Sequence, residues 1–217
     1  MSTCSKTIMP QRDFMDDKMI KWRYGEKPNF TKVNELWSQQ RSKIHKPGSL
    51  EETVENFAKT FEMEASHKID PKDWKTVDVA KFTIQTNGGK VYRFEDLLKR
   101  GTYNIMMDEC PFYNNNKETF TTSHDAFCAA FPRGFAWEVL EVLTGPPKLI
   151  FTWRHFTDWQ GLYGNVPPDG RSINMEGLAI VQLAANCPEL KMESIKLYYD
   201  PNPMMSRLTG NMPQKAV

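Results

Sequence analysis

The chain has 217 residues, of which 40% are apolar and 25% charged, and its formal net charge is +1. A chain of this length fits one domain that buries about 70% of its unfolded surface, so stability requires neither a disulfide nor a metal. Basic and acidic residues balance without forming a basic block, which argues against nucleic acid as a partner. No apolar window of about 18 residues predicts a membrane span, and residues 1–10 do not read as a signal peptide.

The cysteines and histidines show no spacing typical of a metal site. Cys4, Cys110, Cys128 and Cys187 are unpaired in spacing, and without a predicted signal peptide they favour free thiols in a reducing compartment. The four histidines are scattered, and neither a Gly-rich phosphate loop nor a dinucleotide fingerprint is present. We therefore expect a cytoplasmic protein without a metal or an organic cofactor.

The first half of the chain predicts helices. Residues 1–30 lack periodicity and are expected to form an extended arm, while apolar residues near a 3.6-residue period predict a helix over 31–45. Ser49, with Glu52 three residues on, forms a capping-box pattern. It predicts a second helix that ends near His67.

The second half predicts mostly strands. Residues 74–85 read as a strand that a tight Asn-Gly-Gly turn joins to 90–94, and helices are expected at 93–107 and 123–131. A meander of four strands follows, in which a Gly-Pro-Pro turn joins the first two as a hairpin, and residues 209–217 read as a disordered tail. Helices first and an antiparallel meander last predict an α+β domain over 31–208, with helices on one face of a curved sheet and a cavity at its mouth. The meander strands are expected at 134–144, 148–156, 172–184 and 191–200.

One histidine lies in the most apolar of these strands. Alternation places Leu149, Phe151, Trp153 and His155 on one face of strand 148–156. His155 is either a core imidazole bonded to a neighbour or an acid or base in a pocket, since imidazole titrates near neutrality. Arg154 points the other way, which favours an ion pair across strands with Glu138 or Glu141.

His67 and Asp200 are further candidates, each with a structural alternative. His67 lies in the last turn of its helix, where a protonated imidazole gains from the helix dipole; the alternative is a pair with Glu64, Asp70 or Asp200 in a pocket. Tyr198 and Asp200 share a face at the end of the last strand, where they could position and deprotonate an acidic C–H. The sequence Asp200-Pro-Asn-Pro is also typical of a turn that ends a strand.

Several segments, taken in order along the chain, resemble the plant pathogen-related protein family. This family belongs to the SnoaL-like polyketide cyclase group of the nuclear transport factor 2-like superfamily. The resemblance covers roughly residues 20–200. Its segments are Trp22-Arg-Tyr-Gly25, Gly48-Ser-Leu-Glu-Glu52, Glu62-Met-Glu64, His67-Lys68, Phe131-Pro-Arg-Gly-Phe-Ala136, Gly145-Pro-Pro147, Arg154-His155 and Pro167-Pro168.

The resemblance implies a cone-shaped fold in which helices cover a curved, mostly antiparallel sheet around a pocket. It also implies a homodimer, because members of the wider superfamily often pair through the open sheet face. SnoaL-like cyclases close rings by aldol chemistry without a cofactor and use a pocket aspartate near the end of the last strand. Asp200 lies at a comparable place, and His67 and His155 lie within segments shared with the plant proteins.

Three hypotheses remain open. The first is a cofactor-free cyclase, isomerase or dehydratase acting on a small, mostly apolar polyketide- or terpenoid-like compound. Its candidate acid/base residues are His155, Asp200, His67 and Tyr198. The second is a carrier or sensor that uses the same pocket, and the third is a dimeric interaction module with an inert cavity. The predicted lining residues are Trp37, Phe61, Trp137, Phe151, Trp153 and Met175.

Overall fold

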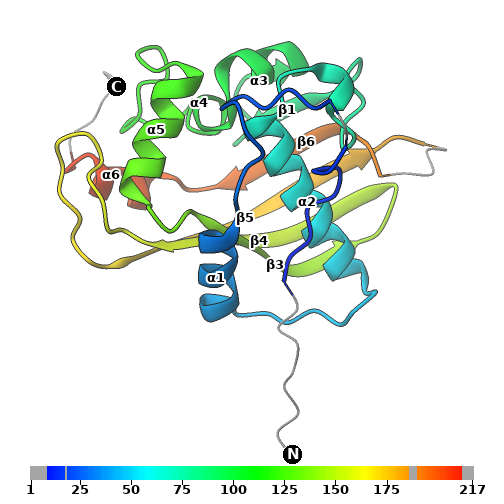
Figure 1. The fold of residues 1–217 in the computed structure, drawn as a ribbon, viewed down its shortest axis with the longest axis horizontal. Coiled ribbons are helices and arrows are strands. Elements are labelled where there is room, and N and C mark those ends of the chain that lie inside the picture. The colour runs from blue at the N-terminus through cyan, green and yellow to red at the C-terminus, as the bar shows by residue number, and fades with distance from the viewer. Residues whose placement is uncertain (1–8, 18, 186–189, 212–217) are drawn as a thin grey trace, which may run out of the picture.

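The computed structural model describes residues 9–17, 19–185 and 190–211 (Figure 1). They form a six-stranded sheet with the strand order β2-β1-β6-β5-β4-β3. Neighbouring strands are antiparallel except β1 and β6, which are parallel. The strands are β1 (Thr83–Thr86), β2 (Val91–Arg93), β3 (Ala136–Thr144), β4 (Lys148–Asp158), β5 (Ser172–Leu183) and β6 (Met192–Tyr199).

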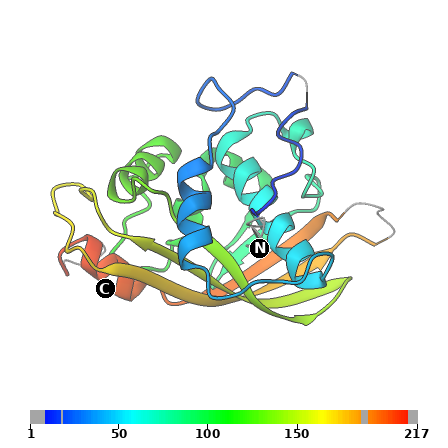
Figure 2. The same cartoon turned by 60° about the horizontal axis from the view of Figure 1, so that its bottom comes forward.

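Helices cover one face of this curved sheet, as Figure 2 shows. The long helix α2 crosses over the middle strands, the helices of the 94–130 segment lie over the β1 end, and α1 packs beside β3. The α+β architecture expected from the sequence is confirmed. The helices are α1 (Thr31–Gln40), α2 (Leu50–His67), α3 (Phe94–Arg100), α4 (Thr102–Met106), α5 (Phe120–Ala130) and α6 (Asn202–Leu208), with one 3₁₀ turn at Pro71–Asp73.

The predicted start and end of α2 are confirmed. Oγ of Ser49 accepts a hydrogen bond from the Glu52 N–H at 3.3 Å, and the Glu52 carboxylate in turn accepts one from the Gly48 N–H at 2.7 Å. These bonds satisfy backbone donors that the first turn of a helix leaves open. Val54, Phe61 and Ala65 are buried and hold α2 against the sheet.

Strands β3 and β4 form the expected hairpin, and their alternation fixes which side chains face the helices. His155 lies opposite Trp137 on β3 and opposite Met175 on β5. Leu149, Phe151 and Trp153 are buried on the same side of β4. The sheet therefore presents a row of large side chains to α2.

Helix α1 ends at Gln40 instead of reaching residue 45. The buried carboxylate of Glu138 accepts hydrogen bonds from the Ser42 N–H at 2.8 Å and the Lys43 N–H at 3.1 Å. It also lies 2.6 Å from Nε of Arg154, which confirms the predicted ion pair across strands. Because these N–H groups bind a carboxylate, they are not available to continue the helix.

Two other expectations from the sequence are wrong, and one helix was not predicted. Only Thr83–Thr86 of the expected strand 74–85 is a strand, because Asp78 accepts hydrogen bonds from Lys81 and Phe82 and makes a turn. The expected helix 93–107 is broken in two at Gly101, where φ is +82°. Helix α6 was not predicted, and it packs Met204, Met205 and Leu208 into the core.

The N-terminal arm runs along α2. The Gln11 N–H donates to Oδ1 of Asn56 at 2.9 Å, and the Asp13 N–H donates to Oγ1 of Thr60 at 3.1 Å. No helix in the described part of the chain is long and apolar enough to cross a membrane. Cys128 is a free thiol, as expected, and Sγ of Cys110 lies 3.5 Å from Oδ1 of Asn202. Cys4, Cys187 and residues 212–217 of the predicted tail lie outside the described residues.

Candidate functional site

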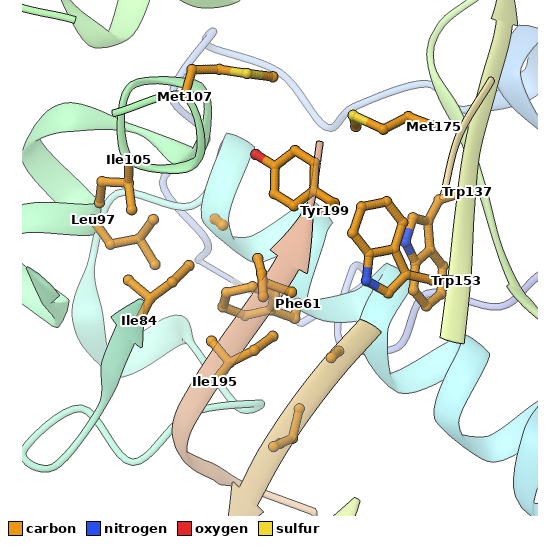
Figure 3. Packing of buried hydrophobic residues seen from close by; sticks show 14 of the residues in the cluster. Phe61, Ile84, Leu97, Ile105, Met107, Trp137, Trp153, Met175, Ile195 and Tyr199 are labelled. Carbon is orange, nitrogen blue, oxygen red and sulfur yellow. The ribbon is translucent and has the colours of Figure 1, made fainter. Parts of the chain in front are cut away.

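A cavity of about 830 Å³ lies between the helices and the sheet. Figure 3 shows Phe61 from α2, Trp137 from β3, Trp153 from β4 and Met175 from β5 gathered around this region. The lining is rich in aromatic and thioether groups, which favour apolar ligands. They are Phe30, Phe61, Tyr103, Phe131, Phe135, Trp137, Phe151 and Trp153, together with Met63, Met106, Met107 and Met175.

The structure places most of the predicted site residues in this wall. Phe61, Trp137, Phe151, Trp153 and Met175 all line the cavity, as do the two histidines singled out from the sequence, His67 and His155. Three of the predicted site residues, Trp37, Tyr198 and Asp200, do not line it.

Trp37 belongs to a separate small cluster beside the sheet edge. It packs with Leu36 of α1, Ala136 of β3 and Phe156 of β4. Ala136 and Phe156 alternate with Trp137 and His155 along their strands, so they point away from the cavity. The prediction that Trp37 lines the pocket is therefore wrong.

Tyr198 and Asp200 do share a face, but it is the outer face of the sheet. Tyr198 is 39% exposed, and its neighbour Tyr199 is the residue that points inward and is buried. The Asp200 side chain accepts a hydrogen bond from the Asn202 N–H at 3.0 Å. Asp200 thus forms the turn that ends β6 and lies outside the cavity, so the structure does not support a pocket role for either residue.

An acid/base pair joins α2 to the sheet inside the cavity. Nε2 of His155 lies 3.4 Å from Oε1 of Glu62, and both residues line the cavity. The His155 ring also lies against Phe135, with ring centroids 4.4 Å apart, and edge-on to Trp153 at 5.7 Å. Aromatic contacts on both sides hold the imidazole toward the carboxylate. Among the described residues, Nδ1 of His155 is buried without a hydrogen-bond partner.

Glu62 presents its carboxylate to the cavity. Its side chain is 40% exposed although helices and sheet surround it, because the exposed surface belongs to the cavity wall. Burial alone would raise the pKa of Glu62, but the contact with His155 and the charges of Lys59 and Arg12 outweigh burial and lower it. Glu62 is therefore an ionised carboxylate at neutral pH in apolar surroundings.

Sequence reasoning missed Glu62 as a site residue. The sequence feature that could have indicated Glu62 is its position next to Phe61, at the edge of the apolar face of α2. Ser66, four residues later and on the same helix face, also lines the cavity. A carboxylate on such a border can reach across to the facing strand. The sequence does not show which strand that is.

His67 faces the cavity as a neutral imidazole. Burial, followed by the charge of nearby His124, lowers the pKa of His67 to about 4. Its ring meets Tyr24, Phe30 and His124 edge-on, and Nδ1 lies 3.3 Å from the Met63 carbonyl oxygen. The sequence suggested a protonated His67 that gains from the helix dipole. The lowered pKa instead leaves the imidazole neutral at pH 7.

Two of the carboxylates that the sequence offers as partners of His67 bind other groups. Glu64 is fully buried and binds Nζ of Lys68 at 3.0 Å and the Thr76 N–H at 3.0 Å, which ties α2 to the next loop. Asp70 pairs with Lys72. In the described ranges, no group of three or more His, Cys, Asp and Glu side chains is arranged to hold a metal ion.

Fold and site together define an α+β protein in which helices and a curved sheet enclose an apolar cavity that contains a carboxylate–imidazole pair. A pathogen-related protein from Hordeum vulgare is 33% identical over 191 residues, covering 85% of this chain and 80% of the barley protein. The chain therefore belongs to the pathogen-related protein family, as its sequence motifs indicated. No protein-family model matches the chain.

Solved structures with partial similarity include putative polyketide cyclases. A putative polyketide cyclase from Acidithiobacillus ferrooxidans overlaps 77% of this chain and 100% of its own, with a TM-score of 0.43 and 15% identity. A putative SnoaL-like polyketide cyclase from Jannaschia overlaps 77% of this chain and 98% of its own, with a TM-score of 0.40 and 13% identity.

Proposed function

We propose that the protein binds a small, mostly apolar molecule and moves a proton on it without a cofactor, as a cyclase, isomerase or dehydratase does. The observation that carries the proposal is the Glu62–His155 pair, 3.4 Å apart on the wall of the 830 Å³ cavity. A positioned acid or base contributes a factor on the order of 10²–10⁴ to a rate.

We propose different tasks for the two side chains. Glu62 is ionised and exposed to the cavity, so its carboxylate can accept a proton from a C–H group of a bound molecule. Nδ1 of His155 is buried, whereas Nε2 faces the carboxylate. His155 therefore orients Glu62 and stabilises its charge, and the proton held by Glu62 can return to another atom of the same molecule.

The apolar lining also suits a carrier or sensor, which is the second candidate. Aromatic and methionine side chains from both layers would bind an apolar molecule whether or not it reacts. The two candidates differ in what Glu62 does. An enzyme needs its ionised carboxylate, whereas a carrier of a neutral apolar molecule gains little from it.

The experiment measures proton abstraction on a generic substrate. 5-Nitrobenzisoxazole is small and apolar, and removal of the C–H proton of its isoxazole ring by a base breaks the N–O bond and releases a coloured phenolate. We expect the wild-type protein to accelerate this reaction and Glu62→Gln to lower the rate on the order of 100-fold or more. Glu35→Gln serves as the matched control, because Glu35 is exposed on α1 and does not line the cavity.

A wild-type rate equal to that of Glu62→Gln would show that Glu62 is not a base. Binding of the benzisoxazole without any acceleration would favour the carrier. Native mass spectrometry of the purified protein complements the assay, since a tightly bound carrier ligand should co-purify with the chain.

A further inference from the structure

The N-terminal arm contributes an arginine to the cavity wall. Nη1 of Arg12 donates a hydrogen bond to Oδ1 of Asn34 at 2.9 Å, and the guanidinium lies 3.9 Å from the centroid of the Phe30 ring. The arm itself is fixed on either side of this residue by the bonds from Gln11 and Asp13 to α2. Arg12 is therefore held in one position, with its planar group against an aromatic face.

Most N–H donors of this guanidinium remain available to a ligand. An arginine carries five N–H donors, and one of those of Arg12 is used by Asn34. Among the described residues no carboxylate forms an ion pair with Arg12, and Glu62, whose charge acts on it, is in contact with His155 instead. Burial lowers the pKa of Arg12 to about 10, so the group is still a cation at neutral pH. A partly buried cation of this kind is stabilised by an anion that binds its free donors.

Arg12 lies at the mouth of the cavity, near the first turn of α1. Arg12 and Phe30 also line an open surface hollow of about 440 Å³, so they stand between the cavity and solvent. The first turn of α1 lines the same region, where a helix N-terminus carries partial positive charge and Lys32 adds a full one. Arg133, a further arginine of the lining, is by contrast paired with Asp158 at 3.4 Å.

We infer that the molecule bound in the cavity is an amphipathic carboxylic acid. Its carboxylate binds the Arg12 guanidinium at the mouth, and its apolar body lies among the aromatic and methionine side chains farther in. The planar fork of arginine matches the two oxygens of a carboxylate. This inference rests on the proposed function only in requiring that the cavity binds a small molecule, and it does not require that the molecule reacts.

The test compares two fluorescent probes that differ at one end. Pyrenebutyric acid and pyrenebutanol share the aromatic body and differ in the carboxylate. Fluorescence titration of the wild-type chain should give a Kd for the acid at least tenfold lower than for the alcohol. Arg12→Gln should abolish this preference and leave the Kd of the alcohol unchanged, and Arg12→Lys, which keeps the charge and loses the fork, should give an intermediate preference.

The matched control is Arg23→Gln. Arg23 lies in the same arm and also stacks on an aromatic ring, that of Phe120 at 3.8 Å, but it does not line the cavity. It should keep the wild-type preference for the acid. Equal affinities of the wild type for acid and alcohol, no binding of the acid, or a preference that survives in Arg12→Gln would each overturn the inference.

A further variant distinguishes this inference from the proposed function. Glu62→Gln should lose proton transfer and still prefer the acid, because Arg12 is intact. If Glu62→Gln and wild type are equally inactive while the acid preference holds, the proposed chemistry fails and the carboxylate site stands.

Discussion

The proposed proton transfer depends on how one carboxylate is kept ionised. Burial disfavours the charge of Glu62, and the contact with His155 together with the charges of Lys59 and Arg12 reverses that effect. Because the pKa of Glu62 is lowered, the carboxylate persists as the pH falls and is lost only when the pH drops through the lowered value. A reaction that uses Glu62 as the base should therefore keep its rate from neutrality down to that acidic limit.

His155→Phe should move this acidic limit to higher pH. Phenylalanine retains the packing against Phe135 and Trp153 but removes the hydrogen bond and the charge that lower the pKa of Glu62, so burial then dominates. The measurement is kcat/KM for 5-nitrobenzisoxazole between pH 4 and 8. His155→Gln, which keeps a neutral donor, should give a smaller displacement. Wild type and His155→Phe profiles with the same acidic limb would contradict the role given to His155.

Side-chain alternation predicted part of this site. The row of Phe151, Trp153 and His155 follows from the period of a strand, and all three line the cavity. The same reasoning showed that Tyr198 and Asp200 share a face, but periodicity does not show which face the helices cover. Glu62 was missed because its role arises from a contact between α2 and β4, which lie far apart in the sequence.

At the scale of elements, one strand position without a side chain makes room for Trp153 in the cavity wall. Gly177 of β5 pairs with Trp153 of β4, and a Cβ atom at Gly177 would lie 2.4 Å from Cζ2 of Trp153 and 2.7 Å from the carbonyl oxygen of Tyr198. The indole of Trp153 thus lies over the backbone of β5. Its position in the cavity wall depends on that glycine.

Gly177→Ala should displace the Trp153 ring and destabilise the fold by about 1–3 kcal/mol, the usual cost of overpacking. Urea denaturation followed by tryptophan fluorescence measures the free energy of unfolding. Gly145→Ala is the control, since the new Cβ there would meet only Cδ2 of Leu50 at an ordinary 3.5 Å. Equal stability of the two variants would show that the sheet accommodates a methyl group beside Trp153.

Elements with explicit end signals were predicted best. The cap at Ser49 placed the start of α2 correctly, and the Gly-Pro-Pro turn placed the β3–β4 hairpin. Elements whose ends depend on distant partners were predicted less well. Helix α1 is shorter than expected because the Glu138 carboxylate accepts hydrogen bonds from the N–H groups that follow the helix. Helix α6 was not predicted, although Pro203 lies in its first turn, where proline is well suited to a helix.

At the scale of the whole molecule, the sheet has two unlike faces. One face carries the cavity. On the other face α1 covers Ala136 of β3 and Phe156 of β4, and the middle of the sheet is left open in the view of Figure 2. Strand alternation places Ile150, Leu178, Ile180 and Tyr198 together on the open face, where Ile150 pairs with Ile180 and Leu178 with Tyr198. All four are partly or largely exposed. A sheet face with such an apolar centre is suited to contact with a second copy of the chain.

We expect a homodimer that forms through this face. Light scattering at micromolar concentration should give twice the mass of one chain. Leu178→Asp should give a monomer, because it places a charge opposite Tyr198 at the centre of the apolar patch. Val91→Asp is the matched control, since Val91 is 53% exposed on the edge strand β2, away from the patch. This variant should stay dimeric.

A wild-type monomer would contradict the dimer, whereas a dimer that survives Leu178→Asp would place the interface elsewhere. Because Leu178 points away from the cavity, the monomer should bind pyrenebutyric acid as the wild type does.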